Sequence, residues 1–120
     1  MSFLWVFVGG GLGSVARYTI GLGLNKWTDT LFPWATLISN ILATGILGAT
    51  LYFFLSRWQD QSWIYPLIAV GFCGGFSTFS TFSSETMNLI TTGNYVIAGL
   101  NVLISMVSGL AILFLLQRLR

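Results

Sequence analysis

The sequence predicts an all-α integral membrane protein with four transmembrane helices. Of its 120 residues, 55% are hydrophobic and only 7% are charged, whereas about 25% are charged in an average soluble domain. Four apolar stretches, at residues 3–24, 34–55, 66–90 and 95–116, each approach the roughly 20 residues that a helix needs to cross a bilayer. Their connections are short and polar, so we interpret residues 1–120 as a single four-helix membrane domain surrounded by lipid.

The composition also argues against several functions. Cys73 is the only cysteine and histidine is absent, which rules out an internal disulfide and transition-metal sites built on His and Cys clusters. The same shortage leaves no nucleophile and base for an enzyme. The formal net charge of +2 is small and scattered, so we expect no nucleic-acid partner.

The charges outside the spans give little preference for one orientation. An even number of spans puts both termini and the second connection on one side, with Arg57, Arg118 and Arg120, while Lys26 lies on the other. Lysine and arginine near the span ends set the topology of a membrane protein. This small difference agrees with insertion either way round, and equally with a modest preference for cytoplasmic termini.

Four short helices are too few to enclose a wide aqueous path and still present an apolar surface to lipid, so we expect an oligomer. Small residues spaced four apart let helix backbones approach closely in membranes. Three such pairs occur in the spans: Gly9 and Gly13, Gly71 and Gly75, and Ser105 and Gly109.

Two adjacent glycines open an unusual segment of the third span, "GGFSTFSTFSSE" at 74–85. Glycine is a poor helix former and is permissive in its backbone angles, so the pair predicts a break near Gly74 and Gly75. Irregular backbone within a membrane needs protein, water or an ion to satisfy it, and carbonyls of unwound helices can hold sodium. Close packing of helices explains the two glycines equally well.

The same segment carries aromatic rings and hydroxyls at helical spacing. The rings are those of Phe76, Phe79 and Phe82, and the hydroxyls are those of Ser77, Ser80, Thr81 and Ser84. Either pattern alone is typical of packing. Together they indicate another use, because ring edges carry partial positive charge and hydroxyls donate hydrogen bonds. The combination can coordinate a small dehydrated anion weakly enough for conduction.

Further polar residues lie within the predicted spans. Asn40 offers two amide donors at mid-span, either to an ion path or to an interhelical packing contact. Arg17 either snorkels to the headgroups or attracts anions towards a vestibule. Glu85 is an intramembrane carboxylate, which by default indicates function; it either pairs with Arg17 or lies near an interface. Asn101, with Ser105 one turn later, repeats the Asn40 pattern in a weaker form.

These residues resemble a known family, the CrcB/Fluc fluoride channels of bacteria. The resemblance covers nearly the whole chain and rests on "GGGLGSVARY" in the first span, "ATLISN" in the second and "GFCGGFSTFSTFSSE" in the third. It implies an antiparallel, dual-topology homodimer in the bacterial inner membrane, with two fluoride pathways and a structural sodium ion at the dimer interface. The implied function is passive export of toxic cytoplasmic fluoride.

The resemblance also implies roles for individual residues. Asn40 would face the pore, and the ring edges of Phe79 and Phe82 would line the fluoride path. Ser80 and Thr81 would belong to its polar track, while the backbone carbonyls of Gly74 and Ser77 would hold the sodium ion. Family members often carry threonine where this chain has Ser77, which leaves a backbone role intact but puts a side-chain role in doubt.

The main alternative is a small proton-coupled four-helix drug exporter. Such exporters are similar to this chain in size and depend on a membrane-buried glutamate in the first helix. Here the first span has no acidic residue, and the only glutamate, Glu85, lies in the third. We therefore expect a fluoride channel.

Overall fold

The computed structural model describes every residue except 55–56 and 58–60, and the regular secondary structure of the described residues is entirely helical, with no strand. Four segments are long and apolar enough to cross a membrane, which confirms the predicted all-helical membrane fold. In chain order the elements are α1 (Ser2–Trp27), α2 (Trp34–Ala49), the π-helical η1 (Thr50–Phe54) and η2 (Tyr65–Phe72), α3 (Cys73–Phe76), α4 (Phe79–Thr91) and α5 (Tyr95–Arg118).

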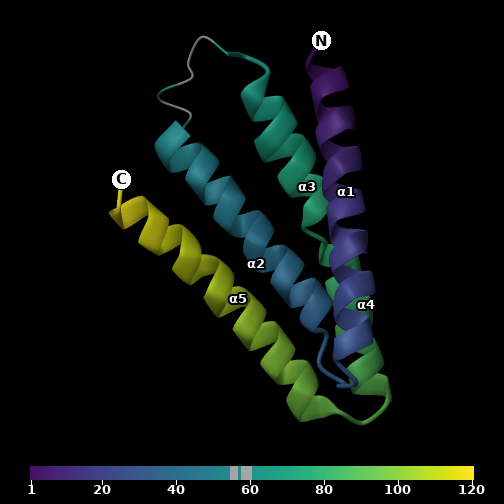
Figure 1. Ribbon diagram of the computed structural model, residues 1–120. Coiled ribbons are helices and arrows are strands. Elements are labelled where there is room, and N and C mark those ends of the chain that lie inside the picture. The colour runs from purple at the N-terminus through teal and green to yellow at the C-terminus, as the bar shows by residue number, and fades with distance from the viewer. Residues whose placement is uncertain (55–56, 58–60) are drawn as a thin grey trace.

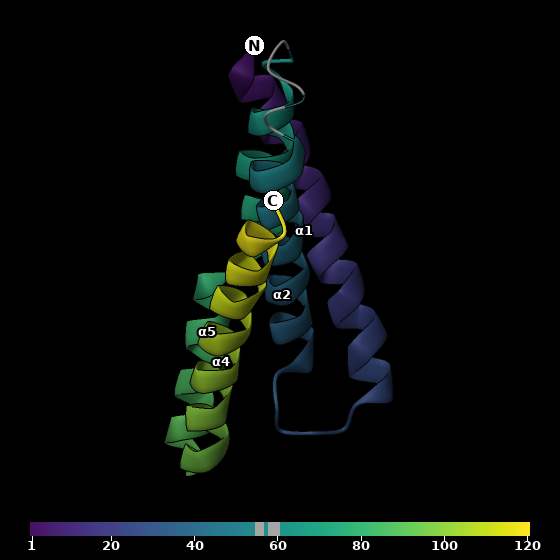
Figure 2. The ribbon, with the colours of Figure 1, turned by 90° about the vertical axis from the view of Figure 1, so that its left-hand side faces the viewer.

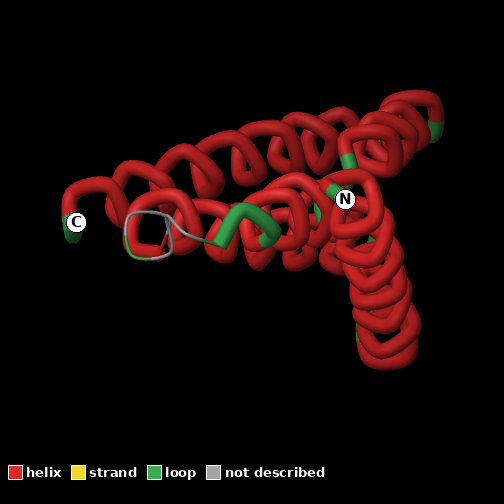
Figure 3. The backbone as a smooth tube through the Cα atoms, turned by 90° about the horizontal axis from the view of Figure 1, so that it is seen from above, coloured by secondary structure: helices red, strands yellow, loops and turns green. Residues whose placement is uncertain are grey.

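The helices run up and down but do not form a closed bundle. In Figure 1, α1 descends from the N-terminus, α2 returns, and the third span descends beside α1 until α4 ends at the foot of the molecule. From there α5 rises along α2, against which it packs. Figure 2 shows the lower end of α1 diverging from α4 and α5, and the view from above in Figure 3 shows the helices splayed apart. A cavity lined by residues of α1, α2 and α4 lies at this end of α1.

Glycines hold α1 against the upper half of the third span. A side chain at Gly9 would collide with the backbone carbonyl of Leu67, and one at Gly13 with the carbonyl of Phe72. Across the interface, a side chain at Gly75 would collide with the carbonyl of Gly10. Two of the predicted small-residue pairs therefore bring helices together within one chain, as glycines do in membrane helices.

The third small-residue pair, Ser105 and Gly109 on α5, is not used in this way. A side chain added at Gly109 would meet nothing within 4 Å. Gly109 therefore leaves open space on α5, whereas the Ser105 hydroxyl is buried within the chain.

The third span is broken, as predicted, but not at the glycines. Gly74 and Gly75 lie inside helix α3, and the extended residues are Ser77 (φ −75°, ψ 157°) and Thr78 (φ −152°, ψ 116°). The break thus lies near the two glycines, two to three residues after Gly75, and the glycines themselves stay helical. The physical reason is that Gly75 serves close packing on Gly10, while the break forms where side chains satisfy the freed backbone.

Candidate functional site

Asn40, in the middle of α2, pairs with the backbone at the break. Its Oδ1 accepts a hydrogen bond from the amide of Thr78 at 2.7 Å, and its Nδ2 donates to the carbonyl of Thr78 at 3.4 Å. In an uninterrupted helix the Thr78 amide would donate to the carbonyl of Gly74. A buried amide without a partner is costly, so Asn40 makes a break at this depth tolerable.

Thr78 also caps α4. Its Oγ1 accepts from the amide of Thr81 at 3.2 Å and donates to the Thr81 hydroxyl at 3.1 Å. An N-cap of this kind contributes about 1 kcal/mol to a helix. Thr78 was not among the residues predicted from the sequence. Threonine is nevertheless a common N-cap residue, and Thr78 directly precedes the "FSTF" run at residues 79–82.

Two larger cavities lie beside the break. The first, which we call the phenylalanine cavity, has a volume of about 390 Å³. Within it the rings of Phe79 and Phe82 lie with centroids 6.1 Å apart at an interplanar angle of 36°. The hydroxyl of Ser105 is buried and has no hydrogen-bond partner among the described residues. The lining residues come from α2, the break, α4 and α5: Asn40, Thr44, Ser77, Thr78, Phe79, Phe82, Ser105 and Met106.

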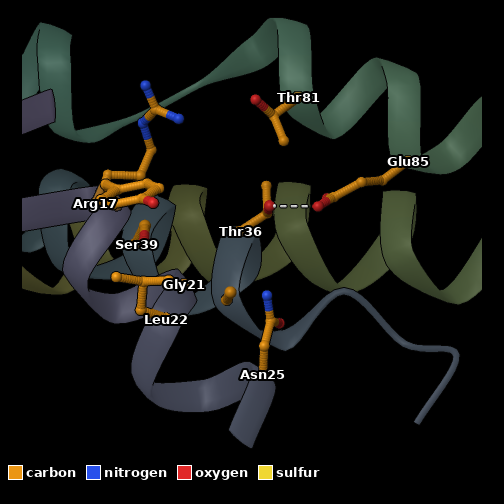
Figure 4. A pocket seen from close by; sticks show the side chains of 10 residues that line it. Arg17, Gly21, Leu22, Asn25, Thr36, Ser39, Thr81 and Glu85 are labelled. Atoms are coloured by element: carbon orange, nitrogen blue, oxygen red, sulfur yellow. Dashed lines mark hydrogen bonds between the residues drawn. The ribbon is translucent and has the colours of Figure 1, made fainter. Parts of the chain in front are cut away.

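The second, the arginine cavity, lies where α1 diverges from α4, and it has a volume of about 210 Å³. Arg17 reaches from α1 to the last turn of α3, where its Nε donates to the carbonyl of Gly75 at 3.3 Å. Glu85 accepts a hydrogen bond from Thr36 at 2.9 Å on Oε1 (Figure 4). Its other oxygen, Oε2, is buried without a partner in the described part of the chain. Arg17 and Glu85 thus bond to other groups, although they line one cavity.

Ser39, which also lines the arginine cavity, has an unusual hydroxyl. Serine and threonine within helices commonly donate to the carbonyl four residues earlier, and Thr44, Thr50, Ser77 and Thr86 all do so here. Ser39 is 0% exposed, yet its hydroxyl has no partner among the described residues. It is therefore a donor left available within the arginine cavity.

A further polar cavity leads from the arginine cavity towards one end of the molecule. It has a volume of about 320 Å³ and shares Asn25, Ala35 and Glu85 with the arginine cavity. It reaches the α1–α2 and α4–α5 connections, where it is lined by Thr28, Thr30, Asn88, Thr92 and Asn94 among others. Polar groups thus continue from the foot of the molecule to Arg17.

The residues predicted to line an ion path do not all line the same cavity. Asn40, Phe79 and Phe82 line the phenylalanine cavity together, whereas Thr81 lines the arginine cavity. Ser80 is exposed on α4 and lines neither cavity. The rings do not form one continuous stripe, because Phe76 is buried on α3 and pairs with Phe72 instead, at a centroid distance of 5.4 Å.

Gly74 and Ser77 lie together at a small cavity of about 160 Å³, which also includes Thr44 and Cys73. The amide and the hydroxyl of Ser77 both donate to the carbonyl of Cys73, at 2.9 and 2.8 Å. Gly74 is exposed, and a side chain there would meet nothing within 4 Å. Gly74 thus lies on the last turn of α3 and Ser77 at the break itself, where helix carbonyls lose their usual partners.

Comparison with known proteins gives a consistent result. Residues 4–116 match the family described as CrcB-like protein, Camphor Resistance (CrcB). A protein of Magnetococcus marinus named "Fluoride-specific ion channel FluC" is 43% identical over 105 residues, which cover 88% of this chain and 85% of that protein.

Two further relatives carry the same name. The protein of Pectobacterium carotovorum is 43% identical over 110 residues, covering 91% of this chain and 85% of the relative. The protein of Coxiella burnetii is 42% identical over 106 residues, which cover 88% of this chain and 86% of that relative. These relatives are named as ion channels and not as enzymes. The chain is a multi-pass membrane protein that belongs to the CrcB/FluC family.

Proposed function

We propose that this chain forms a fluoride-selective channel for passive export of cytoplasmic fluoride across the bacterial inner membrane. The observation that carries this proposal is the placement of two cavities beside the start of α4, one lined by Arg17 and the other mainly by apolar side chains, with the hydrogen-bonded hydroxyls of Thr78 and Thr81 between them. The family relatives named as fluoride-specific channels support the choice of ion. Fluoride enters cells as neutral hydrogen fluoride, dissociates there and then needs a path for the anion.

The proposed path begins in the arginine cavity, where the charge of Arg17 attracts anions and Ser39 offers an unused hydroxyl donor. It continues past the Thr81 and Thr78 hydroxyls to the phenylalanine cavity. There the ring edges of Phe79 and Phe82 carry the partial positive charge that can replace part of the ion's water shell.

Ser105 supplies a second unused hydroxyl donor within the phenylalanine cavity. Asn40 holds the break in place through Thr78, and its side chain also lines this cavity. The donors at the phenylalanine cavity are neutral, so the anion binds there weakly enough to leave again, as conduction requires.

We infer that the working unit is an antiparallel homodimer. The ring of Phe79 is 79% exposed in the single chain, and Ser80 beside it is exposed as well. A second copy would cover these residues, complete the polar track and pack on the open space at Gly109. The small charge difference between the two ends of the spans agrees with insertion in both orientations.

We also propose a structural sodium ion held by the backbone carbonyls of Gly74 and Ser77. The fit rests on the break, because the Thr78 amide that would satisfy the Gly74 carbonyl donates to Asn40 instead. Carbonyls at the end of a half-helix are suitable sodium ligands. When bound, the cation would offset the negative end of α3. Replacing sodium with a large organic cation should lower the thermal stability of the purified protein, and unchanged stability would count against this site.

The deciding experiment is fluoride efflux from liposomes that contain the purified protein, with chloride efflux as the control. We expect rapid fluoride efflux and little chloride efflux. No flux, or equal flux of both ions, would refute the proposal. Because the buried Oε2 of Glu85 is the feature that a proton-coupled exporter would use, uptake of a cationic drug driven by a pH gradient should be measured in the same liposomes. Such uptake without fluoride efflux would favour the exporter.

A further inference from the structure

Asn101 on α5 is among the most deeply buried side chains of the described residues, at 1% exposed. A primary amide buried at this depth is costly unless it is hydrogen-bonded. Its Nδ2 donates to the hydroxyl of Thr86 on α4 at 2.9 Å. The residue is therefore committed to a contact between α5 and α4.

Thr86 passes this contact on to Phe82. The Thr86 hydroxyl has a single proton, which it donates to the carbonyl of Phe82 at 2.8 Å, so it receives the Asn101 amide on a lone pair. Two bonds thus run in one direction, from Asn101 through Thr86 to the backbone of Phe82, and bonds in such a chain polarise one another. The helical turn that carries the Phe82 ring is tied to α5.

These two hydrogen bonds, which we call the Asn101 tie, link two walls of the phenylalanine cavity. Phe82 comes from α4, one turn before Thr86, and Ser105 comes from α5, one turn after Asn101. The hydrogen-bonded chain therefore lies one turn from each wall and fixes the position of the ring relative to the unused Ser105 hydroxyl. This hydrogen-bonded chain has a large influence on the position of α4, because α5 is the main packing neighbour of α4 and α2 touches α4 only slightly.

We propose that Asn101 is a positioning residue, which acts through Thr86 to hold the Phe82 ring at the spacing that admits fluoride in preference to chloride. The inference rests on the proposed fluoride conductance, since it assigns the selectivity of that pathway to the α4–α5 spacing. Loss of the tie lets the ring move away from Ser105, and a wider cavity favours the larger anion.

The test variant is Asn101→Leu, which removes the donor but retains the number and branching of the side-chain heavy atoms. Thr86 still donates to Phe82, so no buried donor is orphaned and the chain should assemble. We expect the ratio of fluoride to chloride permeability in liposomes to fall about fivefold, which corresponds to about 1 kcal/mol, the net contribution of a typical hydrogen bond. NMR of isotope-labelled phenylalanine should also show faster motion of the Phe82 ring, a readout that does not depend on conduction.

Two control variants separate positioning from packing. Thr86→Ser retains both hydrogen bonds and should keep the wild-type permeability ratio. Leu89→Val removes part of a buried apolar side chain from the same helix and should lower thermal stability without changing the ratio. A wild-type ratio and unchanged ring motion in Asn101→Leu would overturn the proposal, as would an equal fall in Leu89→Val. If the wild-type protein itself does not select fluoride, the proposed function fails instead, and the ring motion still tests the tie.

Discussion

The side chain of Asn40 pairs with both backbone groups of Thr78, so one residue on α2 satisfies the interruption of the third span. The same arrangement places the amide of Asn40 on the wall of the phenylalanine cavity. Structural support of the break and lining of the proposed path therefore depend on a single side chain. This overlap determines what a substitution at Asn40 would do.

Asn40→Ala should destabilise the protein by about 1–3 kcal/mol, because it leaves the Thr78 amide buried without a partner. Fluoride efflux through the variant should also fall below that of the wild-type protein. Thermal unfolding in detergent and efflux from liposomes measure the two effects. Thr44→Val is the matched control, since Thr44 lines the same cavity but donates only to the carbonyl of Asn40. Full stability of Asn40→Ala would show that the break does not depend on this residue.

Phe82→Ile should slow fluoride efflux by about tenfold or more, the equivalent of about 1.4 kcal/mol, with assembly intact. The aliphatic side chain fills space but lacks a positively polarised ring edge. Efflux is compared with that of Phe76→Ile, which changes a buried ring that pairs with Phe72 away from the cavity. Wild-type flux in an assembled Phe82→Ile protein would remove this ring from the mechanism.

Ser39→Ala should have opposite effects on stability and transport. Removing a buried hydroxyl that has no partner should stabilise the chain by up to about 1 kcal/mol, whereas loss of the donor should raise the fluoride concentration needed for half-maximal efflux. Thr50→Val serves as the control, because the Thr50 hydroxyl is already bonded to the carbonyl of Ile46. Destabilisation by Ser39→Ala together with unchanged transport would contradict a role as a free donor.

The adjacent glycines of the third span should respond differently to alanine. Gly75→Ala forces a methyl group into the backbone of Gly10 and should cost about 1–3 kcal/mol, as overpacking does. Gly74→Ala meets open space within the chain and should leave its thermal unfolding nearly unchanged. Circular dichroism during heating measures both variants. If Gly74→Ala and Gly75→Ala lost the same stability, the close packing of Gly75 on α1 would not be the cause.

Hydropathy alone was sufficient to predict four spans, because a membrane requires about 20 apolar residues for each helix. It could not locate the break. The doublet of Gly74 and Gly75 is equally suited to unwinding and to close packing, and only the position of Gly10 on α1 decides between them. The break lies at Thr78 because Asn40, 38 residues earlier, reaches its backbone.

The polar contacts between helices were still harder to predict from the sequence. Asn101 and Thr86 are 15 residues apart on different helices, so their contact depends on how each helix is rotated about its axis. The same holds for Thr36 and Glu85, which the sequence gives no reason to pair. Membrane helices expose apolar residues on all sides, and their hydrophobic pattern therefore says little about which face turns inward.

Several hydroxyls in the spans donate hydrogen bonds within their own helix, and this affects how easily protons could cross a membrane that holds a proton gradient. Protons hop along chains of hydroxyls and waters that can each donate and accept in turn. Thr44, Thr50, Ser77 and Thr86 have already given their protons to carbonyls of their own helices, so they cannot relay another without breaking a bond. Of these four, Thr44 and Ser77 line the phenylalanine cavity, so among the hydroxyls on its wall only those of Thr78 and Ser105 remain for a proton relay.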